Sequence, residues 1–359
     1  MNRKLLISLA AGIVLSCAGF YLALRNVPVS DLVAYMGAIQ YVWLIPAVFL
    51  GLFTFVLRAL RWRIILSTSV DLSFSEAFHP MMTGFLINTI LPGRVGEVAR
   101  PAIINKRDKV PFTLGLSTIA AERVFDLVSL ISLLGIVMSF VSIDPGFRIT
   151  FKGYSLDRTT LDHITSAMTA ICALLIAAII AVSIPAVLDF AKKIISAMPS
   201  MLFFAGAQSK QKVYEKISIP LMGILDNISA GLSMVKYPKK IIACIIYSFL
   251  VWGLQACALY VMAKGCPGID LTFTQLTAVF VILCFFIALP SVPGFWGLWE
   301  AGGVFGLALF GIGAKNAAGF ALASHAVMMF PMMILGMISA MIIGVNILDV
   351  SFPGAEKVG

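Results

Sequence analysis

The sequence predicts an all-α, polytopic integral membrane protein with about six full spans and two re-entrant hairpins that are broken at Pro-Gly. Of its 359 residues, 60% are hydrophobic and only 12% are charged, and the mean hydropathy is +1.01. A soluble domain typically has about 25% charged residues. In lipid the backbone must satisfy its own hydrogen bonds, which favours helices. We therefore expect one transmembrane domain over residues 1–350 and a short cytoplasmic tail over residues 351–359.

The first two predicted spans cover residues 5–24 and 41–60, each about as long as a bilayer requires. Basic residues before the first span place the N-terminus in the cytoplasm, and a cleaved signal peptide is the alternative for this segment. The second span ends in three arginines. They mark a cytoplasmic end, and they either anchor the helix or bind anionic headgroups: Arg58, Arg61 and Arg63.

The first hairpin is expected over residues 73–104. It begins near Ser75-Glu76, a helix-start signal, and breaks at Pro92-Gly93. The apolar piece after the break is too short to span, and it leads into a strongly basic segment, residues 105–109. A segment that starts and ends on the cytoplasmic side with a break between its halves is typical of a re-entrant hairpin. Such breaks are tolerated where they line a protein cavity.

The next span, residues 112–141, contains Glu122, Arg123 and Asp126. Spacings of three and four residues place these charges on one helix face. Charged side chains at membrane depth are costly and usually face a protein interior or a water-filled cavity. The cluster therefore indicates either a functional site or an ion cluster that only locks helices together.

The second half of the chain repeats this organisation. Residues 164–188 are expected to span, residues 189–240 to form a cytoplasmic amphipathic segment, and residues 241–263 to span again. The second hairpin covers residues 272–313, and the last span covers residues 317–347. Whether the second half of this hairpin crosses the membrane or returns is open. Most of the 26 Lys and Arg fall on the cytoplasmic side of this topology, so both termini are expected there, in the cytoplasmic (inner) membrane.

The two hairpins share a motif at their breaks. PGRVGE in the first and PGFWGLWE in the second both contain Pro-Gly-x-x-Gly followed closely by a glutamate. The first hairpin is expected to enter from the cytoplasm and the second from outside. Interrupted segments of opposite orientation predict an inverted repeat with a binding site near the midplane. The break residues are Pro92, Gly93, Gly96, Pro293, Gly294 and Gly297.

The motifs LPGRVGEVAR, ERVFD and PGFWGLWE, in this order, resemble those of the flippase-like transmembrane domain of lysylphosphatidylglycerol synthases. The resemblance covers nearly the whole chain. In the bifunctional members of that family this domain moves the lipid between leaflets, while a separate soluble domain aminoacylates it. The resemblance implies lipid translocation without aminoacyl transfer, because this chain has no room for the second domain. Phe295 and Trp296 are bulkier than the residues usual in the third motif, so we expect a narrowed or reshaped cavity.

We expect the chain to translocate an anionic lipid or a lipid-linked headgroup. The absence of a Walker motif excludes direct driving by ATP. The expected partners are a membrane phospholipid or a polyprenyl-phosphate-type lipid, and a lipid-synthesis enzyme, but no nucleic acid. Arginines would bind the headgroup, and carboxylates would balance them or carry a coupling proton. The candidate residues are Arg94, Glu97, Arg100, Glu122, Arg123, Asp126 and Glu300.

Two alternatives remain, a membrane-embedded transferase acting on a lipid-linked substrate and a structural accessory subunit of an envelope pathway. The sequence has no HExxH motif, no metal-spaced histidine cluster and no nucleophile elbow, so we expect neither an enzyme nor a bound metal or cofactor. The scattered histidines are expected to be interfacial or capping residues: His79, His163 and His325. The methionines of residues 328–341 indicate ordinary apolar packing rather than an adaptable lipid surface.

Overall fold

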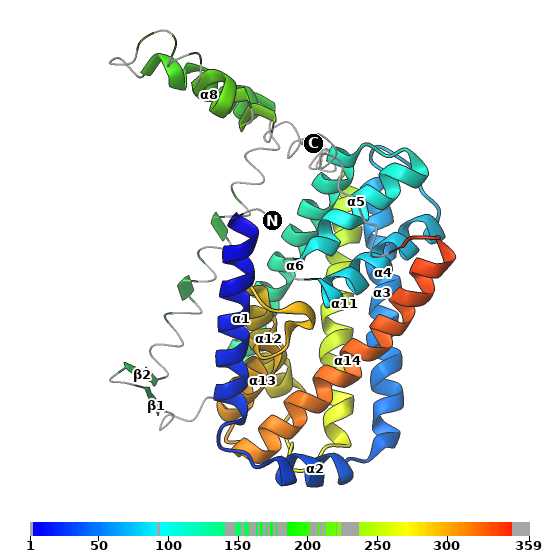
Figure 1. Cartoon of the computed structure of the whole chain (residues 1–359), viewed down its shortest axis with the longest axis vertical. Coiled ribbons are helices and arrows are strands. Elements are labelled where there is room, and N and C mark those ends of the chain that lie inside the picture. Colours follow the sequence, from blue (N-terminus) through cyan, green and yellow to red (C-terminus); the bar gives the residue numbers. More distant parts are fainter. Residues whose placement is uncertain are drawn as a thin grey trace.

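The structure, a computed structural model, is built almost entirely from helices (Figure 1). It describes residues 3–91, 94–140, 148–151, 154–157, 185–201, 213–219, 221–223 and 237–346, with isolated residues elsewhere between 163 and 211. The helices are α1 (Arg3–Leu24), α2 (Val29–Gly37), α3 (Leu44–Leu66), α4 (Phe74–Ile90), α5 (Val95–Asp108), α6 (Phe112–Phe140), α8 (Pro185–Met201), α11 (Pro238–Lys264), α12 (Phe273–Ala288), α13 (Leu298–Ala308) and α14 (Ala314–Ile342).

Three of the described helices are long and apolar enough to cross a membrane. These are Tyr41–Leu66, which includes the 3-10 turn before α3, and α11 and α14. The count rises to four if α1 and α2, which are bent by 75° at a short break, form one broken span. The expected total of six is therefore not established. The predicted span over residues 164–188 lies largely outside the described residues.

Two pairs of helices form the hairpins. α4 packs along α5, and α12 packs along α13. Both first helices begin with a capping box, Ser73 with Glu76 and Thr272 with Gln275. Each such cap contributes about 1 kcal/mol, and the hydrogen bonds from Ser73 lower the pKa of Glu76. α13 has 11 residues, a rise of about 16 Å, so it is too short to cross a bilayer core of about 30 Å by itself.

The breaks that end α4 and α12 have related backbone conformations. The residue after Pro-Gly is left-handed in both, with φ 56° at Arg94 and 62° at Phe295. The break residues Pro92 and Gly93 lie outside the described residues. In the first hairpin a Cβ on Gly96 would collide with the carbonyl oxygen of Gly84, so glycine allows α4 and α5 to approach closely. The breaks meet in space, because α4 also contacts the 3-10 turn η4 (Pro293–Phe295) of the second hairpin.

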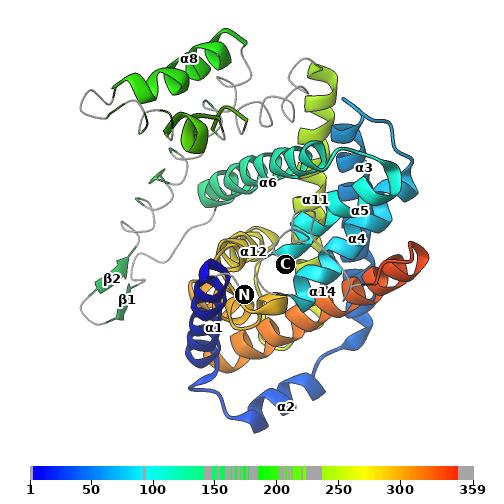
Figure 2. The same cartoon turned by 45° about the horizontal axis from the view of Figure 1, so that its top comes forward.

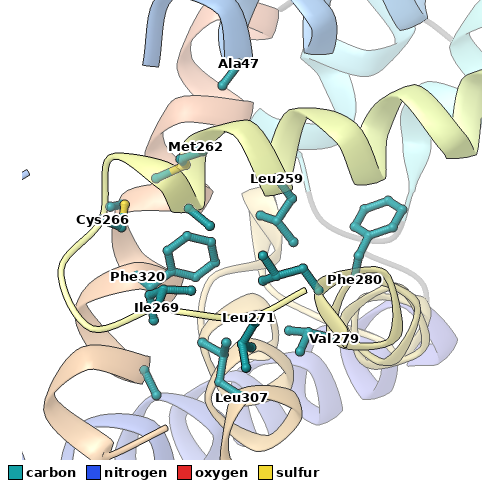
Figure 3. Close-up of a cluster of buried hydrophobic side chains, with 14 of the residues drawn as sticks. Ala47, Leu259, Met262, Cys266, Ile269, Leu271, Val279, Phe280, Leu307 and Phe320 are labelled. Carbon is teal, nitrogen blue, oxygen red and sulfur yellow. The ribbon is translucent and has the colours of Figure 1, made fainter. Parts of the chain in front are cut away.

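The apolar core surrounds the second hairpin and fixes its position (Figure 3). Side chains from α3, α11, α12, α13 and α14 meet there, among them Ala47, Leu259, Val279, Leu307 and Phe320. Gly302 and Gly306 of α13 approach α12, and Gly303 approaches α14. α1 packs against α13, and Figure 2 shows α1 across the bundle from α3. In this contact Ser16 Oγ accepts a 3.1 Å hydrogen bond from the backbone N–H of Val292.

Three details differ from the expectation. The all-α fold class is confirmed, but the sequence did not predict a short antiparallel pair of strands, β1 (Arg148–Phe151) and β2 (Tyr154–Asp157), where β-branched and aromatic residues favour strand. α5 continues to Asp108, so most of the basic segment forms its last turn, where positive charge suits the helix dipole. The amphipathic segment is described only in part. Within it α8 exposes an apolar stripe made by Val187, Phe190, Ile194 and Met198.

Candidate functional site

A buried ion cluster joins α3, α5 and α6. Arg61 Nη1 of α3 donates hydrogen bonds to Asp126 Oδ1 at 2.7 Å and to Ser248 Oγ at 2.6 Å. Arg61 Nη2 lies 3.7 Å from Glu122 Oε1, and Arg100 Nη1 lies 2.9 Å from Glu122 Oε2. These two arginines and two carboxylates neutralise one another. Such a buried group is costly to disrupt, because removing one partner leaves an unpaired charge.

Two tryptophans hold the arginines beside this cluster. The guanidinium of Arg100 lies 4.1 Å from the ring centroid of Trp62, and Trp62 Nε1 donates to Thr118 Oγ1 at 2.9 Å. Arg58 lies 4.7 Å from the ring centroid of Trp252, whose Nε1 donates to Asp126 Oδ1 at 3.2 Å. Cation–π contacts of this kind stabilise guanidinium groups that are buried away from water.

A cavity of about 210 Å³ lies next to the ion cluster and between the two hairpins. The first hairpin contributes Phe85, Asn88, Thr89, Arg94 and Glu97, and the second contributes Phe280, Cys284, Ile287, Gly294, Phe295 and Trp299. Helices α3, α6, α11 and α14 complete the wall. Their contributions are Phe55, Arg58, Arg123, Trp252, Gln255, His325, Met328, Met329 and Met332.

The cavity is lined by arginines that are only partly paired. The side chains of Arg94 and Arg123 are 41% and 39% exposed, whereas those of Arg61 and Arg100 are 1% and 4% exposed. Arg58 makes no hydrogen bond to any described residue, and its ion pair with Asp126 is long at 4.0 Å. Glu97 lies between Arg94 and Arg123. Its Oε1 is 3.8 Å from Arg94 Nη1 and 3.7 Å from Arg123 Nη1. Arg123 Nη2 also lies 3.1 Å from Asp126 Oδ2 of the same helix. Arg58, Arg94 and Arg123 are therefore the cations that line the cavity, and Arg123 shares a carboxylate with the buried cluster.

The first break is held by backbone and side-chain contacts around α5. Gly96 N–H donates to Asn88 Oδ1 at 2.7 Å, which fixes the start of α5 against α4. Arg94, the residue before α5, donates from Nη2 to the carbonyl oxygen of Ile287 at 2.9 Å. Ile287 belongs to the last turn of α12, so this bond joins the first hairpin to the second.

The second break is held by a buried pair, Glu300 and His325. Glu300 Oε2 accepts from Gly297 N–H at 2.7 Å, and Glu300 Oε1 lies 2.6 Å from His325 Nδ1. His325 Nε2 lies 2.8 Å from the carbonyl oxygen of Gly294, which can only accept, so Nε2 carries a proton. The contact between Nδ1 and Oε1 must then also hold a proton. The pair is neutral as a unit, whether as imidazolium with carboxylate or as imidazole with carboxylic acid.

The structure brings every described candidate residue of the sequence into one region, but in different roles. Arg94, Glu97 and Arg123 line the cavity, Arg100, Glu122 and Asp126 lie behind it, and Glu300 holds the second break. Sequence reasoning left Arg58 undecided and missed the buried His325. A helical wheel contains the missing signal, since Arg58, Arg61 and Trp62 share a face of α3 while Arg63 points away to Asp71. Met328, Met329 and Met332 also line the cavity, so these methionines do more than fill the core.

Among the residues that the structure describes, no group of three His, Cys, Asp or Glu is placed to hold a metal ion.

Comparison with known proteins identifies the family to which the chain belongs. The sequence profile described as "Lysylphosphatidylglycerol synthase TM region" matches residues 9–336. The chain belongs to this family. A "UPF0104 membrane protein" of Methanothermobacter thermautotrophicus is 25% identical over 96% of this chain and 94% of its own length. "UPF0104 membrane protein PH1989" of Pyrococcus horikoshii is 21% identical over 72% of this chain and 74% of its own length. No solved structure matches.

One relative corrects an expectation. "Glycosyltransferase AglD" of Haloferax volcanii is 24% identical over 89% of this chain. The alignment covers 52% of AglD, so this chain spans about half the length of that relative. The prediction that the protein is not an enzyme is contradicted by this relative. The prediction was based on the absence of familiar catalytic motifs, and buried carboxylates beside arginines can act in catalysis without those motifs.

Proposed function

We propose that this membrane protein binds the anionic headgroup of a lipid in the cavity between its two hairpins and moves it across the bilayer without ATP. The acyl chains would stay in the surrounding lipid. The observation that carries the proposal is the lining of the cavity, where Arg58, Arg94 and Arg123 face a single carboxylate, Glu97, among the described lining residues. Unbalanced arginines at membrane depth are costly, and an anionic ligand offsets that cost. Arginine also binds phosphate in a bidentate manner.

The two hairpins suggest how the headgroup would move. We propose that they form an inverted repeat and enter the membrane from opposite faces, with both chain termini in the cytoplasm. The matching capping boxes, the Pro-Gly breaks and the left-handed Arg94 and Phe295 support this relation. Alternate movement of one hairpin against the other would then expose the shared cavity to one side at a time. An enzyme of lipid synthesis would be a fitting partner on the side where the lipid is loaded.

A transbilayer assay tests this proposal. The protein is reconstituted in liposomes with a labelled anionic lipid, and the label is quenched from outside. We expect faster transbilayer movement with the wild type, about a tenfold loss of that gain in Arg58→Gln, and no loss in Arg63→Gln. Arg63 is the matched control, because it lies on the same helix but is half-exposed beside Asp71. Unchanged rates on adding the wild-type protein would refute the proposal.

A second candidate function is glycosyl transfer to or from a lipid-linked substrate. The observation in its favour is the alignment of the protein named glycosyltransferase AglD over 89% of this chain. In that function the arginines would clamp the phosphate, and Glu97, which faces the cavity between Arg94 and Arg123, would be the general base. Incubation of purified protein with a polyprenyl-phosphate sugar and an acceptor lipid tests it. A new glycolipid that is absent with Glu97→Gln would favour this function over transport.

A further inference from the structure

We infer that the group bound in the cavity carries two negative charges, as a phosphate monoester does, rather than the single charge of a phosphodiester lipid. The inference deepens the proposed function, on which it rests, by naming the class of headgroup. It follows from how the charges of the described side chains divide between the wall of the cavity and the layer behind it.

The layer behind the cavity is neutral. It holds two arginines, Arg61 and Arg100, and two carboxylates, Glu122 and Asp126. Their side chains are at most 7% exposed. Close contacts of 2.7 Å and 2.9 Å pair one arginine with each carboxylate. Asp126 also lies 3.1 Å from Arg123 and 4.0 Å from Arg58, which does not change the sum of the charges. This layer therefore leaves no charge for a ligand to balance.

The side chains that line the cavity carry a net charge of +2. Arg58, Arg94 and Arg123 face Glu97, and the pair of Glu300 and His325 adds nothing because it is neutral as a unit. Cys284 also lines the cavity, and a thiol is uncharged at neutral pH. A ligand with two negative charges would leave the wall balanced. A ligand with one charge would leave one arginine uncompensated in a low-dielectric site, where unpaired charge is costly.

The positions of the arginines also suit a phosphate. They come from three elements, α3, the start of α5 and α6, so their donors approach the cavity from different sides. The positive end of the α5 dipole adds to the field at Arg94. A terminal phosphate offers three oxygens, each able to accept more than one hydrogen bond, whereas a phosphodiester has two free oxygens.

The size of the cavity restricts what it can enclose. Its volume is about 210 Å³. Pockets that enclose a whole drug-sized ligand usually have about 300–1,000 Å³. The cavity therefore has room for a phosphate and a small part of what it is attached to, but not for lipid chains.

A titration with three lipids that share the same acyl chains tests the inference. Purified full-length protein in detergent is titrated with phosphatidic acid, phosphatidylglycerol and phosphatidylcholine at about pH 8.5, well above the second phosphate pKa of about 6. Binding is read from the fluorescence of Trp252 and Trp299, which line the cavity. We expect phosphatidic acid to bind about tenfold more tightly than phosphatidylglycerol, because charge-assisted hydrogen bonds are strong. Phosphatidylcholine should bind no more than weakly.

Two charge variants make the test specific. Arg58→Gln lowers the net charge of the cavity lining from +2 to +1 and should abolish the preference for phosphatidic acid. Glu97→Gln raises this net charge to +3 and should strengthen the preference. Arg58 makes no hydrogen bond to a described residue, so its variant should fold. Equal affinity of the wild type for the two anionic lipids would overturn the inference but leave headgroup binding intact. Binding of neither would overturn the proposed function as well. Displacement of phosphatidic acid by inorganic phosphate at equal concentration would reassign the cavity to free phosphate.

Discussion

Arg94 Nη2 donates a hydrogen bond of 2.9 Å to the carbonyl oxygen of Ile287, across 193 residues of sequence. This bond joins the break of the first hairpin to the C-terminal end of α12, which is the first helix of the second hairpin. The same side chain lines the cavity and lies 3.8 Å from Glu97. Arg94 therefore serves both the contact between the hairpins and the charge of the site.

Substitutions of Arg94 separate these two contributions. Arg94→Lys keeps the positive charge but loses the planar fork that reaches Ile287, whereas Arg94→Gln loses the charge as well. We expect both variants to lose about 1 kcal/mol of stability from the missing hydrogen bond. Binding of an anionic lipid should fall about tenfold more in Arg94→Gln than in Arg94→Lys. Thermal melting and lipid titration measure the two effects, and equal binding by the two variants would show that the charge of Arg94 does not contribute.

Arg58 and Arg61 lie three residues apart on α3 and should behave in opposite ways. Arg61→Gln removes the buried cation that lies 2.7 Å from Asp126 and 3.7 Å from Glu122, so we expect a loss of about 3–5 kcal/mol of stability. Arg58→Gln removes a cation–π contact and a long ion pair, which should cost about 1 kcal/mol or less. Denaturation of the two purified variants checks this contrast. A folded, stable Arg61→Gln protein would mean that the inner layer is not structural.

Glycine at position 96 is expected to be required for the first hairpin to close. A Cβ there would collide with the carbonyl oxygen of Gly84 and with the Asn88 side chain. We expect Gly96→Ala to destabilise the protein by about 1–3 kcal/mol through overpacking. Gly253→Ala is the matched control in α11, because nothing lies within 4 Å of its added Cβ, and it should stabilise the protein by about 0.5–1 kcal/mol. Equal melting temperatures for the two variants would contradict the packing described here.

Glu300 is expected to act through its hydrogen bonds rather than its charge. In Glu300→Gln the amide oxygen can accept from Gly297 N–H while the amide NH2 donates to Nδ1 of a neutral His325. We expect this variant to stay within about 1 kcal/mol of the wild type, whereas Glu300→Leu leaves both partners unpaired and should cost about 2–6 kcal/mol. Melting curves of the two variants, with expression yield as a second readout, measure the difference. A Glu300→Gln protein as unstable as Glu300→Leu would indicate that the pair must be ionic.

Several starts of the apolar helices were predicted well, because apolar length and Pro-Gly breaks are local signals, but α3 runs past its expected end at residue 60 to Leu66. α11 and α12 begin within about three residues of their expected starts. The family was also recognised correctly from motifs, and the profile match over residues 9–336 confirms it. The extra strand pair was missed because its ten-residue segment also satisfies the composition of a polar loop.

The roles within the site could not be predicted from local signals. Arg58 and Arg61 stand near the end of a span, where arginines usually mark topology. The helical wheel separates their face from that of Arg63, but only the packing against α6 shows which face is buried. Arg100 was expected to bind the headgroup, yet it is stacked on Trp62 and paired with Glu122. These outcomes depend on which helices pack together, which residue types alone do not specify.

The most direct test of the central claim is native mass spectrometry of the protein purified gently from its own membrane. The account predicts that the wild type and Arg63→Gln retain an anionic, phosphate-bearing lipid, and that Arg58→Gln and Arg94→Gln lose it, because only the latter two remove a cation from the cavity. Bulk lipid alone, in equal amounts for all four proteins, would contradict the claim that the cavity between the hairpins is the headgroup site.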